Sequence, residues 1–345
     1  MKIIKKFVNK CLSLLRLGHE WLNKLTTSLI EAARTNSYIE TVSPTQADTI
    51  HKEIKNLDIK FLMKEYEMFV RQSLKELKLE NKHVKIGVDV TEDNTWLIHG
   101  IRNTRPSTHK GNHHVNTFQY LNIAITEPFF FPLMSVPYTS LNNLTSLTID
   151  LLKYLKTLPL KVDMVLFDRG FYIAHLIDYM ENRRGGNPIP YLMFVKKTEP
   201  VKDYIEQTEI FDVFCHTFDY CKDKSGWHPS CNIVIWKPDP KVYPDVAWPF
   251  ATNLSPEQKT IDAYPKRWPH ETGFRVADEA QIKSKSSYLI IRFFYHLLGM
   301  VMVILWRVQS ENNNHVVFKT FLKAVEAKYA KLIVYPVPPP DIAVY

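Results

Sequence analysis

Three acidic residues stand where the sequence predicts strand ends or the start of a helix. Asp89 lies on the polar face of an alternating run, Val84–Val90, that predicts a strand. Asp168 follows the apolar run Val162–Phe167, which is typical of a strand buried on both faces. Glu271 falls in the first turn of a predicted helix. Ligand sites of α/β proteins gather at the carboxyl ends of strands, so these carboxylates are candidates for one site.

Such a set of carboxylates suits the cleavage of phosphodiester bonds with bound metal ions. The reaction places negative charge on the attacking and the leaving oxygen, and two divalent cations can stabilise both. Holding them takes hard oxygen ligands from different structural elements. Each residue also has a purely structural explanation, because a strand-end aspartate often caps a helix and a first-turn glutamate often faces the helix dipole. Spacing alone leaves both explanations open.

The helix that carries Glu271 has a charged face. Arg267, Glu271, Arg275 and Asp278 recur at helical spacing, so their side chains should project from one side. An arginine beside metal-binding carboxylates suits contact with a phosphate. We expect this helix to run over Trp268–Lys285.

The pattern of the whole chain predicts an α/β fold in which helices flank a mixed sheet. Residues 1–80 have helical spacing, and strand-like alternation begins near Val84. Residues 198–262 are rich in aromatic residues and prolines, which gives them the character of an insertion. The expected organisation is a helical domain at 1–80, a main α/β unit at 81–197 and 263–332, a strand-rich insertion at 198–262 and a proline-rich tail at 333–345.

One apolar run, Tyr288–Trp306, approaches the length of a membrane span. Arg292, His296 and Gly299 interrupt it, and the sequence shows no partner span. We expect a buried core helix and no membrane association; a membrane-associated protein is the weakest alternative. The lysine-rich N-terminus is a poor signal peptide, and so few cysteines argue for an intracellular protein.

The charge balance points to an anionic partner. The chain carries 44 Lys and Arg against 36 Asp and Glu, a net charge of +8, which suits nucleic acid. Basic helical segments such as 1–80 often bind DNA, although a helical lid that only packs is the alternative. The stretch from 94 to 126 has no carboxylate and carries Arg102, Arg105 and Lys110. These residues suit contact with phosphates, and a long polar hairpin is the other explanation.

A cluster of cysteines offers a second candidate metal site. Cys215, Cys221 and Cys231 lie near His216 and His228, a set that could bind zinc. The cluster lacks a Cys-x2-Cys pair, so scattered reduced thiols are the default interpretation.

Three segments together resemble the DDE transposases of prokaryotic insertion sequences. They are Gly87–Asp89, Phe167–Tyr172 and Tyr264–Glu271. The resemblance is closest to an archaeal branch of the group named after insertion sequence four. That group has a fingerprint of tyrosine, two residues, arginine, three residues, glutamate, six residues and lysine. Tyr264, Arg267 and Glu271 match it in type and spacing, and the matches span Val84 to about Lys285.

The resemblance implies a ribonuclease H-like catalytic core at 81–197 and 263–332, with residues 1–80 as a DNA-end-binding domain. It implies that Asp89, Asp168 and Glu271 bind Mg2+, or Mn2+ in its place, and carry out catalysis. It also implies that Arg267 contacts a DNA phosphate near the cut and that Tyr264 supports this helix.

The sequence departs from the fingerprint at one position. Asp278 stands where the lysine is expected, and either Lys283 or Lys285 is a candidate substitute for phosphate binding. Asp278 would then hold Arg275 or Arg267 instead. An aromatic residue of the insertion would stack on a flipped base, and packing is the alternative role for these candidates: Trp227, Trp236 and Trp248.

We therefore predict a DNA transposase that binds the terminal inverted repeats of its element and cleaves and joins DNA strands. It would act on target DNA as a homodimer or larger synapse, in the prokaryotic cytoplasm at the nucleoid. A ribonuclease H-like nuclease that cuts without joining is the first alternative. A DNA-binding relic with a decayed active site is the second, and Asp278 is the residue that favours it.

Overall fold

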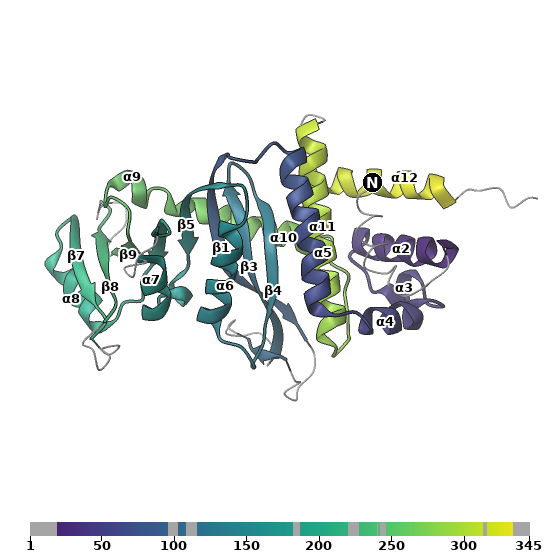
Figure 1. Cartoon of the computed structure of the whole chain (residues 1–345), viewed down its shortest axis with the longest axis horizontal. Helices are drawn as coiled ribbons and strands as arrows, with labels where there is room; N and C mark the ends of the chain where they lie inside the picture. Colours follow the sequence, from purple (N-terminus) through teal and green to yellow (C-terminus); the bar gives the residue numbers. More distant parts are fainter. Residues whose placement is uncertain are drawn as a thin grey trace, which may run out of the picture.

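The structure, a computed structural model, is built around a mixed nine-stranded sheet flanked by helices (Figure 1). It describes residues 19–95, 103–107, 116–181, 187–219, 228–239, 241, 246–312 and 316–333. The α/β class with a mixed sheet and flanking helices is as predicted.

The sheet combines parallel and antiparallel strands. Its strands are β1 (His83–Asn94), β2 (Arg105–Pro106), β3 (Asn116–Glu127), β4 (Phe131–Tyr138), β5 (Lys161–Phe167), β6 (Tyr191–Phe194), β7 (Phe211–Thr217), β8 (Ser230–Trp236) and β9 (Trp248–Thr252). Their order is β2-β3-β1-β5-β6-β9-β8-β7, and β4 also pairs with β3. β1 is antiparallel to β3 and parallel to β5, and β5 is parallel to β6. The segment 198–262 contributes β7, β8 and β9, which extend the same sheet through antiparallel pairs.

Helices cover the sheet and extend the molecule beyond it. They are α2 (His19–Arg34), α3 (Ile39–Val42), α4 (Ala47–Lys55), α5 (Ile59–Glu76), α6 (Leu144–Lys156), α7 (Ala174–Glu181), α8 (Glu199–Gln207), α9 (Gln258–Ile261), α10 (Trp268–Asp278), α11 (Leu289–Asn312) and α12 (Phe318–Ile333), with 3-10 helices η1 (Arg169–Phe171) and η3 (Tyr264–Arg267). Figure 1 shows α5 and α11 side by side next to β4, with α2, α3, α4 and α12 beyond them.

The alternation of β1 places its apolar residues in the core. Val84, Ile86 and Val88 are at most 1% exposed, whereas Lys85 and Asp89 keep contact with solvent. Burying each of these apolar side chains stabilises the fold by about 1.5–3 kcal/mol. The strand thus has one face fixed in the core and one face free to carry functional groups.

α11 contains the apolar run that approaches membrane-spanning length. Its hydropathy and length would allow a span, but 83% of the relevant window is buried inside the protein. Arg292, which interrupts the run, is 2% exposed, and its Nη1 donates a hydrogen bond to Asp93 Oδ1 at 2.8 Å. The same guanidinium donates to the carbonyl oxygens of Ser284 and Ser286. The charge in this helix therefore joins α11 to the end of β1, which agrees with the predicted core helix.

α10 is shorter than the sequence predicts. It ends at Asp278 and does not continue to Lys285. The backbone carbonyl of Asp278 accepts a hydrogen bond from the amide of Asn36, which follows α2. The same carbonyl also accepts a hydrogen bond from the Gln281 backbone N–H at 3.2 Å, so a local turn and a distant residue together satisfy this helix end. The chain then turns toward α11.

Candidate active site

Two glycines allow α10 to lie close to the sheet. A Cβ added at Gly87 of β1 would come within 2.7 Å of the His270 ring. A Cβ added at Gly273 of α10 would come within 2.1 Å of the Phe130 ring, which precedes β4. Nonbonded carbon atoms keep roughly 3.5–4.0 Å apart, so a side chain at either position would push the helix away. These contacts fix Arg267 and Glu271 relative to β1.

Asp89 and Asp168 occupy equivalent places on neighbouring parallel strands. Val88 of β1 is opposite Phe167 of β5, and each aspartate is the next residue in the chain. β5 ends there, whereas β1 continues to Asn94 because β3 pairs along it. The expectation that Asp89 lies next to the end of its strand is therefore wrong. Asp168 precedes η1, but its side chain makes no capping hydrogen bond, so capping does not explain its presence.

Arg267 lies between two of the three carboxylates. Its Nη1 donates to Asp89 Oδ2 at 3.2 Å, and its Nη2 donates to Glu271 Oε1 at 2.5 Å. The arginine side chain is 10% exposed. The ring of Tyr264 has its centroid 5.8 Å from the guanidinium carbon. The buried guanidinium of Arg267 thus links Asp89 of β1 to Glu271 of α10, which comes 182 positions later in the sequence.

The electrostatics of the site depend on all three carboxylates. Burial raises the pKa of Asp89 to about 6, Arg267 and the Val90 backbone N–H oppose this, and the charges of Asp168 and Glu271 reinforce it. Asp168 is therefore close enough for its charge to act on Asp89. A divalent cation would relieve this repulsion between like charges more fully than one arginine can.

His270 is a buried residue that the sequence reasoning missed. Burial, together with the charge of Arg267, lowers its pKa to about 3, so the ring is neutral near neutral pH. Its Nδ1 is 3.9 Å from Asp89 Oδ2, too far for a hydrogen bond. The ring packs over Gly87 and against Phe130 and Phe274. The available signal was its place within the fingerprint segment, directly before Glu271.

A hollow opens over this cluster of carboxylates. It encloses about 560 Å³ between β1 and α10, and we call it the acidic hollow. It is lined by Asp89, Val90, Thr91, Glu92, Asn94, His270, Glu271, Phe274, Arg275 and Asp278. This lining contains four carboxylates, those of Asp89, Glu92, Glu271 and Asp278, and one guanidinium, that of Arg275. Glu271, Arg275 and Asp278 line it together, which confirms that they share a helix face.

The chemistry of the acidic hollow fits a hard cation. Asp89 and Glu271 already hold one cationic group between them, and carboxylate oxygens are the ligands that Mg2+ prefers. In the part of the chain that the structure describes, no group of three or more His, Cys, Asp or Glu side chains is arranged to hold a metal ion. Metal binding would therefore require Arg267 to give up its contacts with both carboxylates.

Asp278, at the position of the fingerprint lysine, does not pair with Arg267. Arg267 holds Asp89 and Glu271 instead, so that expected pairing is wrong. The side chain of Asp278 reaches solvent, but the surrounding protein desolvates its carboxyl group. Together with the charge of Asp93, this raises the pKa of Asp278 to about 7.

Lys283 and Lys285 lie beyond the end of α10. The Lys283 backbone N–H donates to the Ser37 carbonyl oxygen at 3.1 Å, and Lys285 Nζ is 5.4 Å from the ring centroid of Tyr38. Both contacts join this loop to the connection between α2 and α3. Neither lysine continues the helix of Glu271, because that helix ends at Asp278.

Arg105 is engaged at the end of β4. Its Nη1 donates to the Thr139 carbonyl oxygen at 2.8 Å, and its guanidinium carbon lies 4.0 Å from the centroid of the Tyr138 ring. Arg102 and Lys110 lie outside the described residues. The role of all three in binding phosphates stays a prediction.

The cysteines and histidine of the insertion face different surroundings. Cys215 is exposed, Cys231 is buried, and His216 lies within 3.3 Å of the Tyr204 hydroxyl. Cys221 lies outside the described residues. No zinc-type cluster forms among the described residues of this segment.

Two of the three candidate tryptophans pack against each other. Trp236 and Trp248 meet edge to face with ring centroids 5.4 Å apart. Both lie against the small apolar cluster that includes Val234 and Phe250. Trp227 lies outside the described residues. The contacts of the described pair favour the packing explanation over base stacking.

Comparison with solved structures gives a likeness in fold. No protein-family model matches the chain, and no curated protein matches it in sequence. A chain of the piggyBac transposase, from a cryo-EM structure of its synaptic complex with hairpin DNA, aligns with a TM-score of 0.57 and 12% identity. The alignment covers 98% of this chain and 80% of that one. At this identity the likeness shows a shared fold.

Proposed function

We propose that this protein is a DDE-type DNA transposase that cleaves and joins DNA with Mg2+ or Mn2+. The observation that carries the proposal is the convergence of Asp89 and Glu271 on one cationic partner, beside Asp168. The fold shared with the piggyBac transposase adds support, because that protein was imaged on hairpin DNA. The proposal extends to binding of terminal inverted repeats and target DNA by a homodimer, at the nucleoid of a prokaryotic cell.

We place the core in the ribonuclease H-like class. The order β4-β3-β1-β5-β6, with antiparallel pairing up to β1 and parallel pairing from β1 to β6, supports this assignment. The position of Asp89 on β1 and of Asp168 directly after β5 supports it further. The fingerprint of Tyr264, Arg267 and Glu271 is the basis for the finer placement in the insertion-sequence-four-like group.

The carboxylates and the arginine have separate roles in the proposed reaction. Asp89, Asp168 and Glu271 would hold the cations. Bound Mg2+ supplies charge neutralisation at the attacking and leaving oxygens of the phosphodiester. With the carboxylates holding a cation, the guanidinium of Arg267 would be free to bind a phosphate oxygen of the DNA. Tyr264, held against Phe194 and Phe250, limits how far that arginine can move.

The proposal is tested with carboxylate variants. The substrate is a labelled duplex that carries the DNA flanking this gene, incubated with Mg2+. Asp89→Asn, Asp168→Asn and Glu271→Gln should each abolish cleavage while the affinity for the duplex stays close to that of the wild type. A variant that cuts at the wild-type rate removes its residue from the assignment.

A strand-transfer assay separates joining from cutting. With pre-cut ends that carry a free 3′ hydroxyl, the proposed enzyme inserts the labelled end into a plasmid. Cutting without insertion identifies a nuclease of the same fold.

A decayed, DNA-binding relic is the second candidate, favoured by the pairing of Arg267 with the carboxylates. For a relic, Mn2+ titration would give the same binding signal for the wild type and for Asp89→Asn.

A further inference from the structure

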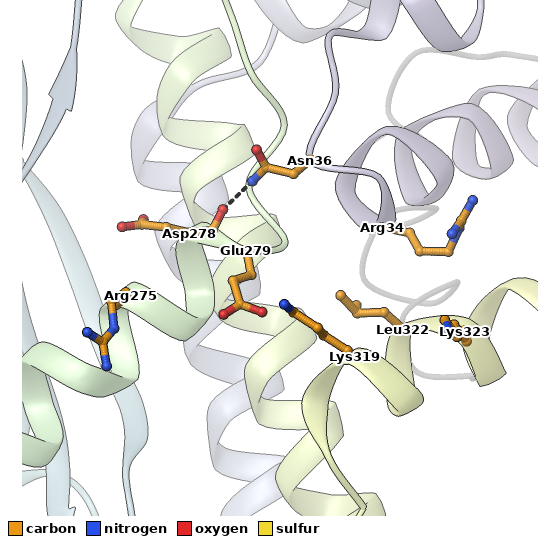
Figure 2. A pocket seen from close by; sticks show the side chains of 8 residues that line it. All are labelled: Arg34, Asn36, Arg275, Asp278, Glu279, Lys319, Leu322 and Lys323. Atoms are coloured by element: carbon orange, nitrogen blue, oxygen red, sulfur yellow. Dashed lines mark hydrogen bonds between the residues drawn. The ribbon is translucent and has the colours of Figure 1, made fainter.

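A second hollow lies next to the acidic one, at the far end of α10. It encloses about 550 Å³ between the end of α10, the helix α12 and the turn after α2 (Figure 2). We call it the basic hollow. The charged residues that line it are Arg34, Arg275, Asp278, Glu279, Lys319 and Lys323.

Three of its cations are available to a ligand. Arg34 is already engaged, because its Nη2 is 2.6 Å from Glu31 Oε1. Arg275, Lys319 and Lys323 are exposed, and within the described residues none of them forms an ion pair. Lys319 and Lys323 lie one helical turn apart on α12 and both line the hollow, and Figure 2 shows the Lys319 side chain directed toward Glu279.

The two acidic residues of the hollow do not cancel this charge. Figure 2 shows the Asp278 side chain directed away from α12, toward the sheet and the acidic hollow. Its raised pKa, about 7, leaves it partly protonated near neutral pH. Glu279 is then the one full negative charge among the lining residues set against Arg275, Lys319 and Lys323. The cavity therefore favours an anion.

The basic hollow continues from the acidic hollow. Arg275 and Asp278 line both cavities. Arg275 lies four residues after Glu271, about 6 Å along the axis of α10. A chain of phosphates that enters the acidic hollow at Glu271 would thus meet Arg275 next and the lysines of α12 after it.

We propose that the basic hollow is a phosphate-binding subsite for the DNA strand that extends from the acidic hollow. Arg275 binds the backbone at the shared wall, and Lys319 and Lys323 bind the phosphates beyond it. We expect the subsite to bind strands of different sequence alike, because its cations bind the phosphates of the backbone. It rests on the proposed function, and it assigns a DNA contact to α12, outside the fingerprint segments.

The test reverses the charges of the two lysines of α12 and leaves the rest of the protein unchanged. The full chain carries Lys319→Glu and Lys323→Glu together, and the matched control carries Lys153→Glu and Lys156→Glu on α6, which lines neither hollow. The probes are a fluorescein-labelled single strand and a labelled duplex of mixed sequence. Fluorescence anisotropy gives the dissociation constant over a series of KCl concentrations.

The expected result is weaker binding with a shallower salt dependence. Losing two phosphate contacts should lower the slope of log K against log salt by roughly 1.4 for the single strand, or by about 1.8 for the duplex. The affinity should fall about tenfold or more at low salt, with little change for the α6 control. Equal affinity and equal slope for the α12 variant and the control would overturn the subsite.

Crosslinking provides a second readout that does not depend on charge reversal. Lys323→Cys, labelled with an azidophenacyl group, should crosslink to the labelled strand, whereas Lys153→Cys should not. Equal crosslinking at both positions would overturn the subsite.

Failure of the subsite and failure of the proposed function give different results. Cleavage that depends on Asp89 together with an unchanged α12 variant rejects only the subsite. A weakened α12 variant of a protein that never cleaves supports the subsite and rejects the transposase. A wild-type protein that binds neither probe rejects both.

Discussion

The acidic and the basic hollow share a wall but differ in how their charges are joined to the fold. Beside the acidic hollow, Arg267 is buried and bonded to two residues that line it, Asp89 and Glu271. In the basic hollow, Lys319 and Lys323 are exposed and form no ion pair within the described residues. The guanidinium of Arg267 is part of the packed interior, whereas the two lysines belong to a solvated surface. Substitution of Arg267 beside the acidic hollow should therefore change the stability of the fold. Substitution of Lys319 and Lys323 in the basic hollow should change the binding of DNA.

The largest effect on stability should come from Arg267→Gln. This change leaves the carboxylate of Asp89, 26% exposed, without its cationic partner and should cost about 3 kcal/mol of unfolding free energy. Mn2+ should stabilise the variant more than the wild type, because it no longer competes with the guanidinium. Thermal melts with and without MnCl2 measure both effects. Arg275→Gln, on the same helix face, is the control and should change stability little.

Equal Mn2+ shifts for Arg267→Gln and the wild type would contradict the idea that Arg267 and the metal share one place. The comparison between the hollows would then lose its electrostatic basis.

The next largest effect should come from Gly273→Ala. The new methyl group would meet the Phe130 ring, which is 3% exposed and packed against Phe274, so it cannot move freely. We expect a loss of about 1–3 kcal/mol in urea unfolding, as for other overpacked cores. Gly170→Ala is the matched control, since its Cβ would have no neighbour within 4 Å. Equal stability of the two variants would show that α10 is not held where we describe it.

A smaller, pH-dependent effect should follow from Asp278→Asn at the shared wall. The folded-state pKa of Asp278, about 7, lies above its ordinary value, so the wild type loses stability as the pH rises toward and through 7. The asparagine variant lacks this loss and should be the more stable protein at about pH 8, by roughly 1 kcal/mol, because solvent screens an exposed side chain. At about pH 4 the two should unfold alike. Thermal melts across this range measure the difference, and a constant difference at every pH would contradict the raised pKa.

The smallest effect on stability should come from Lys319→Ala with Lys323→Ala. Both side chains are exposed, so the unfolding free energy should stay within about 0.5 kcal/mol of the wild type. Chemical denaturation checks this. A loss larger than 1–2 kcal/mol would show that α12 lysines have structural partners, and the contrast between the hollows would fail.

Much of the fold could be predicted because local pattern and burial agree there. In β1, β5 and α11, the pattern of apolar residues matches the side chains that are buried. The alternation of β1 and the apolar runs of β5 and α11 therefore predict these elements correctly. β4 was not predicted, since Pro132 and Pro137 argue against a strand. β4 pairs with β3 alone, and an edge strand tolerates prolines because one side of it needs no ladder hydrogen bonds.

The end of α10 could not be read from its own residues. The sequence continues with helix-compatible residues to Lys285, yet the helix stops where Asn36 bonds the Asp278 carbonyl. That contact joins residues 242 positions apart. Local pattern carries no information about it.

The candidate site was partly accessible to sequence reasoning. The strand patterns and the resemblance pointed to Asp89 and Asp168, and the fingerprint spacing pointed to Glu271. The structure brings Asp89 and Glu271 onto a common partner. The pairing of Arg267 with these carboxylates depends on how the helix meets the sheet, which spacing does not encode. For the same reason, the adjacency of α12 to the end of α10 is visible only in three dimensions.

The interlocking at Gly87 and Gly273 works in both directions. A ring from the helix enters the sheet at one glycine, and a ring from the chain before β4 enters the helix at the other. A translation of α10 along its axis by one residue, or a rotation about that axis, would therefore cause a steric clash. When a metal ion binds, the rearrangement is therefore confined to side chains such as Arg267. The helix itself stays in place and holds the two hollows in a fixed position relative to each other.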